Sequence, residues 1–377
     1  MSRVRVAFIH EHYPPYRHEL FGLLAQRHEV EFFFVNESPR RLPPRSHVLR
    51  GFRIPEMSDF VVAPGLTRAV LRAHEERPFD LILGSDLGSY ATLAAFRAAR
   101  IARRPFVLWS GEWVATRHPR RWLSRPLEAL VVRRSAASLA YGSRAAAYLE
   151  HLGAPRHTIS QTGNTAGYVF ERDDRAHLTR IRSEWGIGER PVVLFLGRLI
   201  PVKSPDLLLG AFARVAAKRP DAFLVVAGEG PMLPALEHQT QSLGLTSVRF
   251  TRRAVVGKAE KDMLFSLAEV FVLPSRRARV AEAWGLVLNE AASAGLPIVV
   301  SGMVGAVGDL IRPGESGMVV PDADEPALEA AILHLLTDRD EARRLGAAAK
   351  HAEAMFTVER MAEAFDRAFA RAMEGAA

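Results

Sequence analysis

The chain has 377 residues, a length that suits two or three domains. Hydrophobic residues make up 48% and charged residues 24%, which is ordinary for globular proteins and excludes a disordered or fibrous chain. No cysteine is present, so disulfides, thiolate metal sites and a cysteine nucleophile are excluded. The 50 Lys and Arg residues exceed the 42 Asp and Glu residues and give a net charge of +8, which favours anionic partners such as nucleic acid, anionic lipid or phosphorylated substrates.

The apolar segments are too short or too interrupted for a signal peptide or a transmembrane helix. The first apolar run covers only residues 6–9, which is shorter than a signal-peptide core. The longest uncharged stretch, residues 291–308, is broken by Gly295, Pro297 and Gly302. We therefore expect a cytoplasmic protein that is soluble or binds only the surface of the membrane's cytoplasmic face.

Short apolar runs rich in β-branched residues alternate with longer helical stretches. The expected strands are 4–9, 30–35, 81–84, 106–109, 139–141, 192–197, 223–228, 248–250, 270–274, 298–301 and 317–320. The expected helices include 90–103, 144–152, 206–218, 231–242, 285–294, 325–336 and 340–354. Continuous apolar strands that alternate with helices are typical of parallel sheets covered on both faces. We therefore expect an α/β fold of the doubly wound type.

The expected strands gather in two sets, one before about residue 145 and one after about residue 190. The polar segment 160–190 between them is interpreted as a connection followed by the first helix of a second domain. The sequence thus predicts an N-terminal domain over residues 1–168 and a C-terminal domain over residues 169–356. The last stretch is amphipathic, and its apolar face carries Met361, Phe365, Ala368 and Phe369.

The first informative motif is LFLGRLIPVKSPDLLLGAF, at residues 194–212. A buried strand ends at Gly197, the loop after it carries Arg198 and Lys203, and a helix opens near Pro205. A strand-to-helix loop with two cations suits a ligand that bears phosphate. The alternative is that both cations are solvated loop charges.

The second motif is VLPSRRARVAEAWGLVLNEAASAGLPIVVS, at residues 272–301. Seven residues separate Glu282 from Glu290, and a helix is expected to start near Gly285. The free amides at residues 285–287 would then face a diphosphate, helped by the helix dipole. Carboxylates accept paired hydrogen bonds, which suits the vicinal hydroxyls of a ribose or a hexose. The alternative is two solvated helix carboxylates.

The third motif is GMVGAVGDLIRPGESGMVVP, at residues 302–321. Gly302, Gly305 and Gly308 allow the backbone to approach a ligand closely. Glycine-rich turns also occur purely for packing.

In this order and at this spacing, the three motifs resemble the C-terminal donor domain of the family 4 retaining glycosyltransferases, which have the GT-B fold. The matching segments are LFLGRLIPVKSPDLLLGAF, LVVAGEGPMLPALE, VFVLPS, EAWGLVLNEAASAGLPIVVS and GAVGDLIRPGESGMVVPDAD, over roughly residues 190–340. The N-terminal half resembles the family more loosely. The resemblance implies two Rossmann-like doubly wound domains that face a central cleft, with a C-terminal helix over residues 357–377 that crosses back to the first domain.

The resemblance also implies roles for the motif residues. Arg198 and Lys203 would bind the donor diphosphate, and the amides at residues 285–287 would cap the phosphates. Glu290 would bind the ribose hydroxyls, and Glu282 would contact hydroxyls of the transferred sugar. Such enzymes need no metal ion, because cations and a helix N-terminus replace it. We therefore expect no metal and no cofactor beside the substrate, a UDP- or GDP-linked sugar.

The implied chemistry is transfer with retention of anomeric configuration. The implied catalytic residues are Arg198, Lys203 and Glu282. The implied donor-binding residues are Gly197, Arg198, Lys203, Gly285, Leu286, Val287 and Glu290.

The loop after the first expected strand departs from the family pattern. It reads HEHYPPYRHEL in place of the family's paired glycines, and it carries His10, His12, Tyr16 and Arg17. Loops at the carboxyl ends of strands in α/β sheets tend to hold ligands, so these side chains are candidates for the acceptor site. Alternatively, the two prolines at residues 14–15 only set a rigid turn, and the histidines are solvated.

Two later segments supply further acceptor-side candidates. In LWSGEWVATRH, Glu112 stands near the position where many relatives carry a catalytic-site histidine. In GSDLGSY, Asp86 follows another strand and either faces the cleft or caps the next helix.

The basic excess is concentrated in two groups, of which the first lies beside Trp113 and Trp122. Such groups suit an anionic membrane surface, at about 1 kcal/mol per nearby cation, or a lipid-diphosphate acceptor. Alternatively, they form solvated Arg-rich faces. The groups consist of Arg117, Arg120, Arg121, Arg125, Arg133 and Arg134, and of Arg40, Arg41, Arg45, Arg50 and Arg53.

The leading hypothesis is a glycosyltransferase that moves a hexosyl-type sugar from a nucleoside diphosphate to an unknown acceptor, lipid-linked or anionic, in cell-surface polysaccharide or glycolipid biosynthesis. One alternative is a glycosyltransferase of a secondary metabolite. Another is an epimerase or a phosphorylase on the same fold, although no context for a pyridoxal lysine is visible. A nucleic-acid-binding protein is suggested by the net charge alone. The sequence contains no recognisable motif for nucleic-acid binding, so we expect no nucleic-acid partner.

Overall fold

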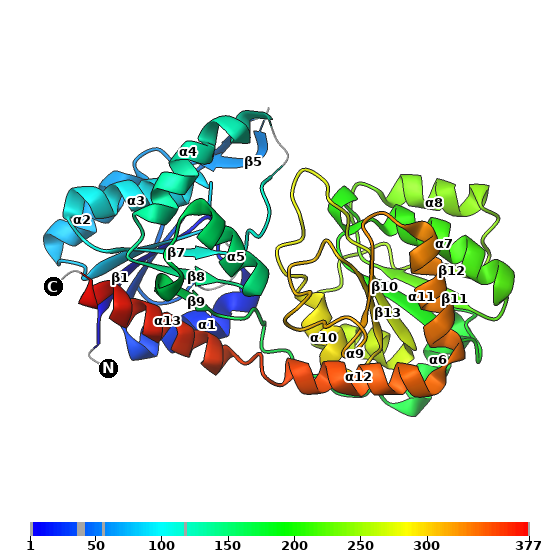
Figure 1. Cartoon of the computed structure of the whole chain (residues 1–377). Helices are drawn as coiled ribbons and strands as arrows, with labels where there is room; N and C mark the ends of the chain where they lie inside the picture. Colours follow the sequence, from blue (N-terminus) through cyan, green and yellow to red (C-terminus); the bar gives the residue numbers. More distant parts are fainter. Residues whose placement is uncertain (1–2, 36–41, 55–56, 117–118, 376–377) are drawn as a thin grey trace. The chain divides into compact units, whose positions relative to one another are not determined.

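The computed structural model describes residues 3–35, 42–54, 57–116 and 119–375. It divides into unit 1, Met1–Gly167 with Phe356–Ala377, and unit 2, Tyr168–Met355. The boundaries expected from the sequence, after residues 168 and 356, each lie one residue from these. Each unit is an α/β layer structure (Figure 1).

Unit 1 is built on a seven-stranded parallel sheet with the order β3-β2-β1-β6-β7-β8-β9. Its central strands are buried almost throughout, as near-continuous apolar runs in a covered parallel sheet must be. The strands are β1 (Arg5–His10), β2 (Glu29–Phe34), β3 (Ser46–Val48), β6 (Leu81–Ser85), β7 (Phe106–Ser110), β8 (Ala137–Ala140) and β9 (Ile159–Gln161). A separate antiparallel pair is formed by β4 (Phe52–Ile54) and β5 (Met57–Val62).

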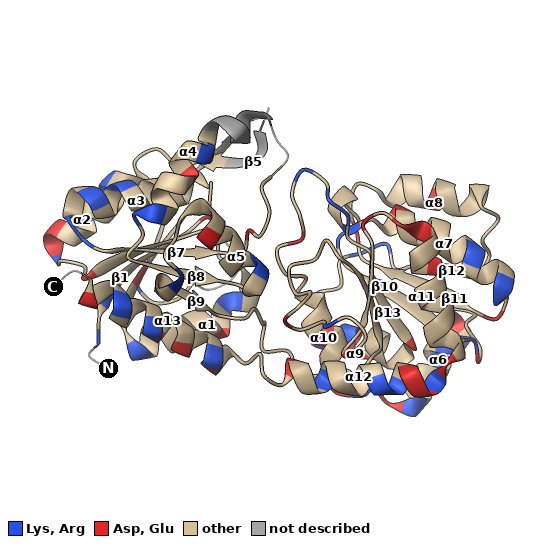
Figure 2. Cartoon of the chain, in the orientation of Figure 1, with Lys and Arg blue, Asp and Glu red and all other residues tan. Residues whose placement is uncertain are grey.

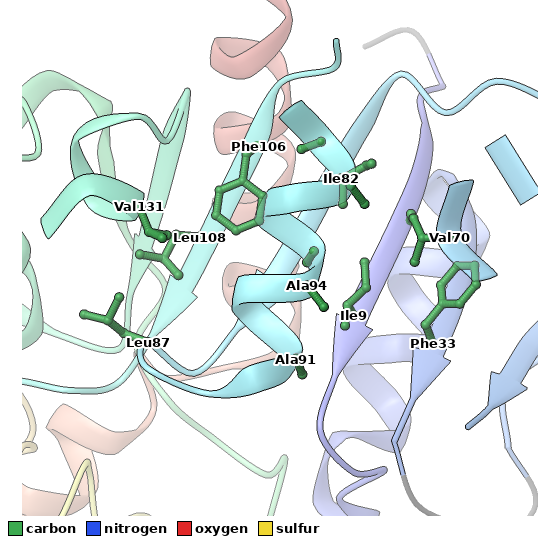
Figure 3. Close-up of a cluster of buried hydrophobic side chains, with 14 of the residues drawn as sticks. Ile9, Phe33, Val70, Ile82, Leu87, Ala91, Ala94, Phe106, Leu108 and Val131 are labelled. Atoms are coloured by element: carbon green, nitrogen blue, oxygen red, sulfur yellow. The ribbon is translucent and has the colours of Figure 1, made fainter. Parts of the chain in front are cut away.

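Helices cover both faces of this sheet. Ala7 and Ile9 of β1 point into the cluster drawn in Figure 3, whereas Val6 and Phe8 point into the cluster on the opposite face. The first cluster is covered by α2 (Leu66–Glu76), α3 (Tyr90–Ala102), α4 (Pro119–Arg133) and α5 (Ser143–Leu152). The second is covered by α1 (His18–Arg27) and α13 (Val358–Glu374).

The amphipathic stretch at the end of the sequence forms α13 and completes unit 1. Its apolar face is buried, and the ring of Phe365 stacks on that of Phe8 with centroids 6.1 Å apart. The side chain of Thr357 caps the helix by accepting a hydrogen bond from the N–H of Arg360.

Unit 2 is built on a six-stranded parallel sheet with the order β12-β11-β10-β13-β14-β15. Its strands are β10 (Val192–Leu196), β11 (Phe223–Ala227), β12 (Val248–Phe250), β13 (Val270–Leu273), β14 (Ile298–Ser301) and β15 (Met318–Val320). Its helices are α6 (Arg175–Glu184), α7 (Pro205–Lys218), α8 (Leu233–Ser242), α9 (Lys258–Leu267), α10 (Val287–Ser293), α11 (Glu325–Thr337) and α12 (Arg339–Glu353). Helix α7 packs against α8 and α11, whereas α9 packs against α6, and α10 against α12.

Both sheets contain one point at which the chain reverses its direction of travel. In unit 1 the chain moves from β1 to β2 and β3, and then returns to the other side of β1 at β6. In unit 2 it moves from β10 to β11 and β12, and then returns to the other side of β10 at β13. Open α/β sheets bind ligands outside the carboxyl ends of the strands at such switch points. The strand ends at these points are therefore where a site is expected in each unit.

The doubly wound α/β class expected from the sequence is confirmed, and β12 has the expected bounds. The expected list did not contain the short strands β3, β4, β5 and β9 or the helices α1, α2, α4 and α9.

Two glycines inside helices give opposite predictions for the same substitution. An added Cβ at Gly346 of α12 would lie 2.2 Å from the carbonyl oxygen of Gly295, whereas at Gly22 of α1 it would meet nothing within 4 Å. Helix propensity favours Ala over Gly by about 1 kcal/mol at both positions. We expect Gly346→Ala to lower the free energy of unfolding by about 1–3 kcal/mol, because the turn after α10 must shift, and Gly22→Ala to leave it unchanged or raise it. Urea denaturation of both variants measures the difference, and equal effects would contradict this reading.

Candidate functional site

The loop between β10 and α7 carries the two cations that the sequence predicts, Arg198 and Lys203. The start of the loop is tied to the neighbouring strand, because the N–H of Gly197 donates to the carbonyl of Ala227 at 3.0 Å. A 3-10 turn at Pro201–Lys203 follows and leads directly into α7. Both cations therefore lie at the switch point of unit 2.

The two cations have different surroundings. The Nζ of Lys203 lies 2.7 Å from Oε2 of Glu282, and each side chain is 15% exposed. Arg198 is exposed, and its guanidinium has no hydrogen bond or ion pair with any residue that the structure describes. Lys203 is thus held in place by a carboxylate, whereas Arg198 is available to a ligand.

The segment that carries Glu282 is fixed by its backbone. Glu282 forms a short parallel bridge with Val304, and its carbonyl accepts the N–H of Gly305 at 2.9 Å. Gly285 has a φ of 84°, and a Cβ there would lie 3.0 Å from the side chain of Leu273. Both the left-handed backbone and the close contact favour glycine at this position.

Helix α10 begins at Val287, two residues after the start that the sequence predicts. The difference arises at Gly285, whose left-handed conformation belongs to the loop and not to a helix. No hydrogen bond from the N–H groups of Gly285, Leu286 or Val287 occurs among the described residues, as expected where a helix starts. These amides are therefore available to an acceptor from outside the chain.

Glu290 lies in α10 and is withdrawn from water. Its Oε1 accepts a hydrogen bond from Nζ of Lys261 at 2.5 Å, and only 9% of its side chain is exposed. Burial raises the pKa of Glu290, and the nearby charges of Lys261 and Lys203 oppose that shift. The structure thus brings Lys203, Glu282 and Glu290 together at one edge of the sheet.

Lys261 was not among the residues predicted from the sequence. It belongs to α9, and 29 positions separate it from its partner. The signal in the sequence is a lysine in the helix that precedes β13, which by itself looks like an ordinary solvated charge.

In unit 1, His10 at the end of β1 and Asp86 after β6 lie on the two sides of the switch point. Their Nε2 and Oδ2 atoms are 4.0 Å apart, and 44% of the Asp86 side chain is exposed. Burial lowers the pKa of His10 well below its usual value, and His12 and Arg17 add to the shift. Since Nδ1 of this neutral ring accepts the N–H of His12 at 3.3 Å, Nε2 carries the proton.

The alternative that Asp86 caps the following helix is wrong. The cap of α3 is Ser89, whose side chain accepts the N–H of Thr92. Asp86 instead has a φ of 68°, a conformation that is uncommon for a residue with a side chain. Partial burial raises the pKa of its carboxyl, opposed by the charges of His12 and Arg17.

Arg17 lies inside unit 1, at 1% exposure. Its guanidinium donates to the carbonyl of Thr165 at 3.2 Å and to Oδ1 of Asn164, and it lies over the rings of Trp109 and Tyr141. These partners are neutral and do not cancel its positive charge. That charge lowers the pKa of His10 and that of Asp86, in each case as a smaller contribution than burial.

The remaining acceptor-side candidates are more open. His12 is exposed, and Tyr16, the middle residue of the 3-10 turn Pro15–Arg17, is 46% exposed. Glu112 follows β7, and its N–H donates to Oγ of Ser110 at 3.2 Å. The alternative of a rigid proline turn with solvated histidines holds for His12 but not for His10, which is buried.

The two basic groups are only partly described. Arg45, Arg50, Arg125, Arg133 and Arg134 are exposed, and Trp113 packs against the core of unit 1 beneath the guanidinium of Arg144. Basic and acidic residues are interspersed along the helices of both units (Figure 2). The side chains of Arg40, Arg41, Arg53, Arg117, Arg120, Arg121 and Trp122 lie outside the described residues.

The described part of the chain lacks both a metal-binding cluster and a membrane-spanning helix. No cluster of three or more His, Asp or Glu side chains with the geometry to hold a metal ion occurs there. No helix within it combines the length and the apolar character needed to cross a membrane.

Comparison with protein families decides which family the chain represents. Residues 14–165 match the glycosyl transferase 4-like domain, and residues 179–352 match the glycosyl transferases group 1 domain. The chain belongs to these glycosyltransferase families. The resemblance seen in the sequence is thereby confirmed, and each matched domain lies within one of the two units.

Several curated proteins named as glycosyltransferases are similar in sequence. The chain is 34% identical over 222 residues to a GDP-mannose-dependent alpha-(1-6)-phosphatidylinositol monomannoside mannosyltransferase of Mycolicibacterium smegmatis, covering 58% of this chain and 54% of the relative. It is 33% identical over 238 residues to a D-inositol 3-phosphate glycosyltransferase of Geodermatophilus obscurus, covering 60% and 50%. It is 31% identical over 175 residues to an alpha-D-kanosaminyltransferase of Streptomyces kanamyceticus, covering 46% and 44%. The chain spans about half the length of the curated relatives it matches.

Solved structures confirm the GT-B fold of the chain. Anabaena Alr3699/HepE, solved with UDP and glucose, has a TM-score of 0.75 at 18% identity and covers 97% of this chain and 99% of its own. Sucrose-phosphate synthase from Thermosynechococcus elongatus has a TM-score of 0.77 at 20% identity and covers 97% and 98%. At these identities the likeness concerns the fold alone.

Glu353, at the end of α12, provides a pH-dependent test of the packing behind α10. Burial raises its pKa to about 7, opposed by Asn289 of α10. A carboxyl whose pKa is higher in the folded than in the unfolded state stabilises the fold at low pH, and that stability is lost as the pH rises from about 4.5 to about 7. We therefore expect Glu353→Gln to raise the free energy of unfolding relative to the wild type, and to do so more at pH 8 than at pH 5. Denaturation at both pH values measures this, with Glu359→Gln on the exposed face of α13 as the control, and an identical effect at the two values would contradict it.

Proposed function

We propose that the chain is a retaining glycosyltransferase that moves a hexosyl group from a nucleoside diphosphate sugar to a hydroxyl acceptor. The observation that supports this most directly is the convergence of Lys203, Glu282 and Glu290 at the switch point of unit 2. Arg198, whose guanidinium is available, lies on the same loop as Lys203. A family domain for glycosyl transfer covers this same unit.

The donor site is assembled from complementary groups. Arg198, Lys203 and the amides at residues 285–287 supply positive charge and hydrogen-bond donors for the diphosphate. Lys203 has three donors, so it can bind a phosphate while it keeps Glu282. Glu282 and Glu290 supply acceptors for the hydroxyls of the sugar and of the ribose.

The reaction breaks the bond between the anomeric carbon and the phosphate oxygen, and it forms a bond from that carbon to the acceptor oxygen. Negative charge grows on the leaving diphosphate as the sugar becomes oxocarbenium-like, and the cations and amides stabilise that charge. For retention, the acceptor attacks from the face that the diphosphate leaves, and the acceptor's proton passes to a phosphate oxygen. No step requires a group that the chain and its two substrates lack.

The names of the relatives suggest which substrates to test first. The mycobacterial relatives are named as GDP-mannose-dependent mannosyltransferases acting on phosphatidylinositol monomannoside, and structural neighbours hold UDP or UDP-glucose. We propose GDP-mannose as the first donor to test and UDP-glucose as the second. For the acceptor we propose an anionic polyol, free or lipid-linked, in glycolipid or cell-surface polysaccharide biosynthesis.

A second candidate function is glycosylation of a secondary metabolite, which the similarity to the kanosaminyltransferase supports. The two candidates differ in the charge of the acceptor. Assays with inositol phosphates and with neutral aminocyclitols, at equal donor concentration, distinguish them. The nucleic-acid alternative rests on the net charge alone.

Arg198→Ala is the clearest test of the donor site, because the side chain has no partner among the described residues that its removal would leave unpaired. Removing one preorganised contact to a developing anion costs about 2.7–4 kcal/mol in the barrier. We expect kcat to fall by about 10²- to 10³-fold, with a smaller change in donor affinity. Release of the nucleoside diphosphate in the presence of acceptor measures kcat. Wild-type turnover by this variant would refute the assignment of Arg198 to the diphosphate.

On the acceptor side, we propose that His10 and Asp86 bind one hydroxyl of the acceptor. An oxygen placed between atoms 4.0 Å apart can accept from Nε2 of His10 and donate to Oδ2 of Asp86 with normal hydrogen-bond lengths. The location at the switch point of unit 1 and the left-handed backbone of Asp86 support a ligand-binding role.

Asp86→Asn preserves the size of the side chain, and Asn tolerates the left-handed conformation. Loss of a charged hydrogen-bond acceptor costs about 1.5–3 kcal/mol, so we expect kcat/KM for the acceptor to fall by about 10- to 100-fold. Donor binding, measured by calorimetry without acceptor, should stay at the wild-type value. A variant with weakened donor binding and normal use of the acceptor would contradict this assignment.

A further inference from the structure

The ion pair between Lys261 and Glu290 is close and largely withdrawn from water, and the proposed donor site gives Lys261 no role of its own. Lys261 comes from α9 and Glu290 from α10, and their atoms meet at 2.5 Å with exposures of 22% and 9%. Bringing a carboxylate and an ammonium this far out of water costs free energy that only close pairing recovers. Because other orientations of the Glu290 carboxylate would lose this pairing and keep the cost of burial, the pair fixes the position of Glu290.

The pairing occupies only part of the carboxylate. Nζ of Lys261 binds Oε1, and an ionised carboxylate has about four acceptor positions over its two oxygens. Within the described ranges no other hydrogen bond to this carboxylate is formed, so its other positions can accept hydroxyl donors. Were the carboxyl protonated, one oxygen would become a donor, and the group would no longer accept two hydroxyls side by side.

The charges around Glu290 favour its ionised form. Lys261 acts from α9 and Lys203 from the turn before α7, and both oppose the effect of burial on the pKa of Glu290. Lys203 is already engaged by Glu282 at 2.7 Å. Lys261 is therefore the cation that both contacts Glu290 and orients it.

The same helix offers a matched residue with a different partner. Lys258 and Lys261 both lie 5.9 Å from the ring centroid of Tyr168. The Nζ of Lys258, however, binds Asp262 at 2.6 Å and Glu171 at 3.2 Å. The two lysines share a helix and an aromatic neighbour, and they differ in the contact with Glu290.

We infer that Lys261 is a positioning residue for ribose recognition, which holds the Glu290 carboxylate in the orientation that accepts hydrogen bonds from the 2′- and 3′-hydroxyls of the donor nucleotide. The inference rests on the proposed function, which assigns Glu290 to the ribose. It predicts that Lys261 affects the contribution of the hydroxyls to binding and not the contribution of the base or the diphosphate.

The test compares a nucleotide with its counterpart lacking both hydroxyls. GDP and 2′,3′-dideoxy-GDP, or the corresponding uridine pair if the wild type binds UDP more tightly, are titrated by calorimetry. For the wild type we expect the natural nucleotide to bind about 10- to 100-fold more tightly, the effect of hydrogen bonds to a charged group. Lys261→Met should reduce this ratio to less than about three-fold by weakening only the natural nucleotide. Lys261→Arg should restore most of the ratio, and Lys258→Met should leave it unchanged.

Two further variants separate the outcomes. If Glu290→Ala keeps the wild-type ratio, or if the wild type binds neither nucleotide, the assignment of Glu290 to the ribose fails, and the proposed donor site fails with it. If Glu290→Ala abolishes the ratio while Lys261→Met keeps it, the donor site stands and the role of Lys261 is refuted. Equal weakening of both nucleotides by Lys261→Met would also refute it. Should Lys261→Met fail to fold, Lys261→Gln takes its place, because it retains a hydrogen-bond donor without the charge. We expect Lys261→Gln to reduce the ratio at least three-fold. An unchanged ratio would overturn the inference.

Discussion

Charged side chains withdrawn from water at the carboxyl ends of the central strands are the constraint on which both units depend. Placing an ion in the interior costs several kcal/mol unless partners compensate it. In unit 2 the compensation is by opposite charge, with Lys203 against Glu282 and Lys261 against Glu290. In unit 1 the buried Arg17 is held by neutral acceptors and aromatic rings. The charges of these pairs in unit 2 therefore largely cancel, whereas the buried Arg17 of unit 1 keeps a net positive charge.

The consequence for binding follows from that difference. Glu282 and Glu290 are each paired with a lysine. Arg198, the exposed cation on the loop after β10, therefore forms no ion pair with them. In unit 1 burial lowers the pKa of His10 and keeps the ring neutral, and the charges of His12 and Arg17 add to this shift. The same two charges oppose the rise that burial causes in the pKa of Asp86. A neutral donor 4.0 Å from a carboxylate suits a hydroxyl, whereas the guanidinium of Arg198 and the amides at residues 285–287 are donors that suit a phosphate.

The sequence predicted the central strands and the order of the donor motifs because both depend on local patterns. Buried parallel strands are continuous apolar runs, and β10, β11 and β13 are of this kind. Short strands at the sheet edge, such as β3 and β9, have only three residues each, too few for a pattern to stand out. The start of α10 was placed two residues early because a left-handed glycine is invisible in the sequence. The role of Lys261 and the buried contacts of Arg17 required the fold, since their partners lie 29 and about 150 positions away.

The return of α13 makes unit 1 a discontinuous structure into which unit 2 is inserted as one uninterrupted segment. During synthesis, the ribosome releases all of unit 2 before the α13 residues that pack on Phe8 and Trp109 exist. Until then the part of that sheet face which α1 does not cover exposes aromatic side chains, which is the kind of intermediate that chaperones bind. Unit 1 is therefore the first unit to be synthesised and the last to complete its fold.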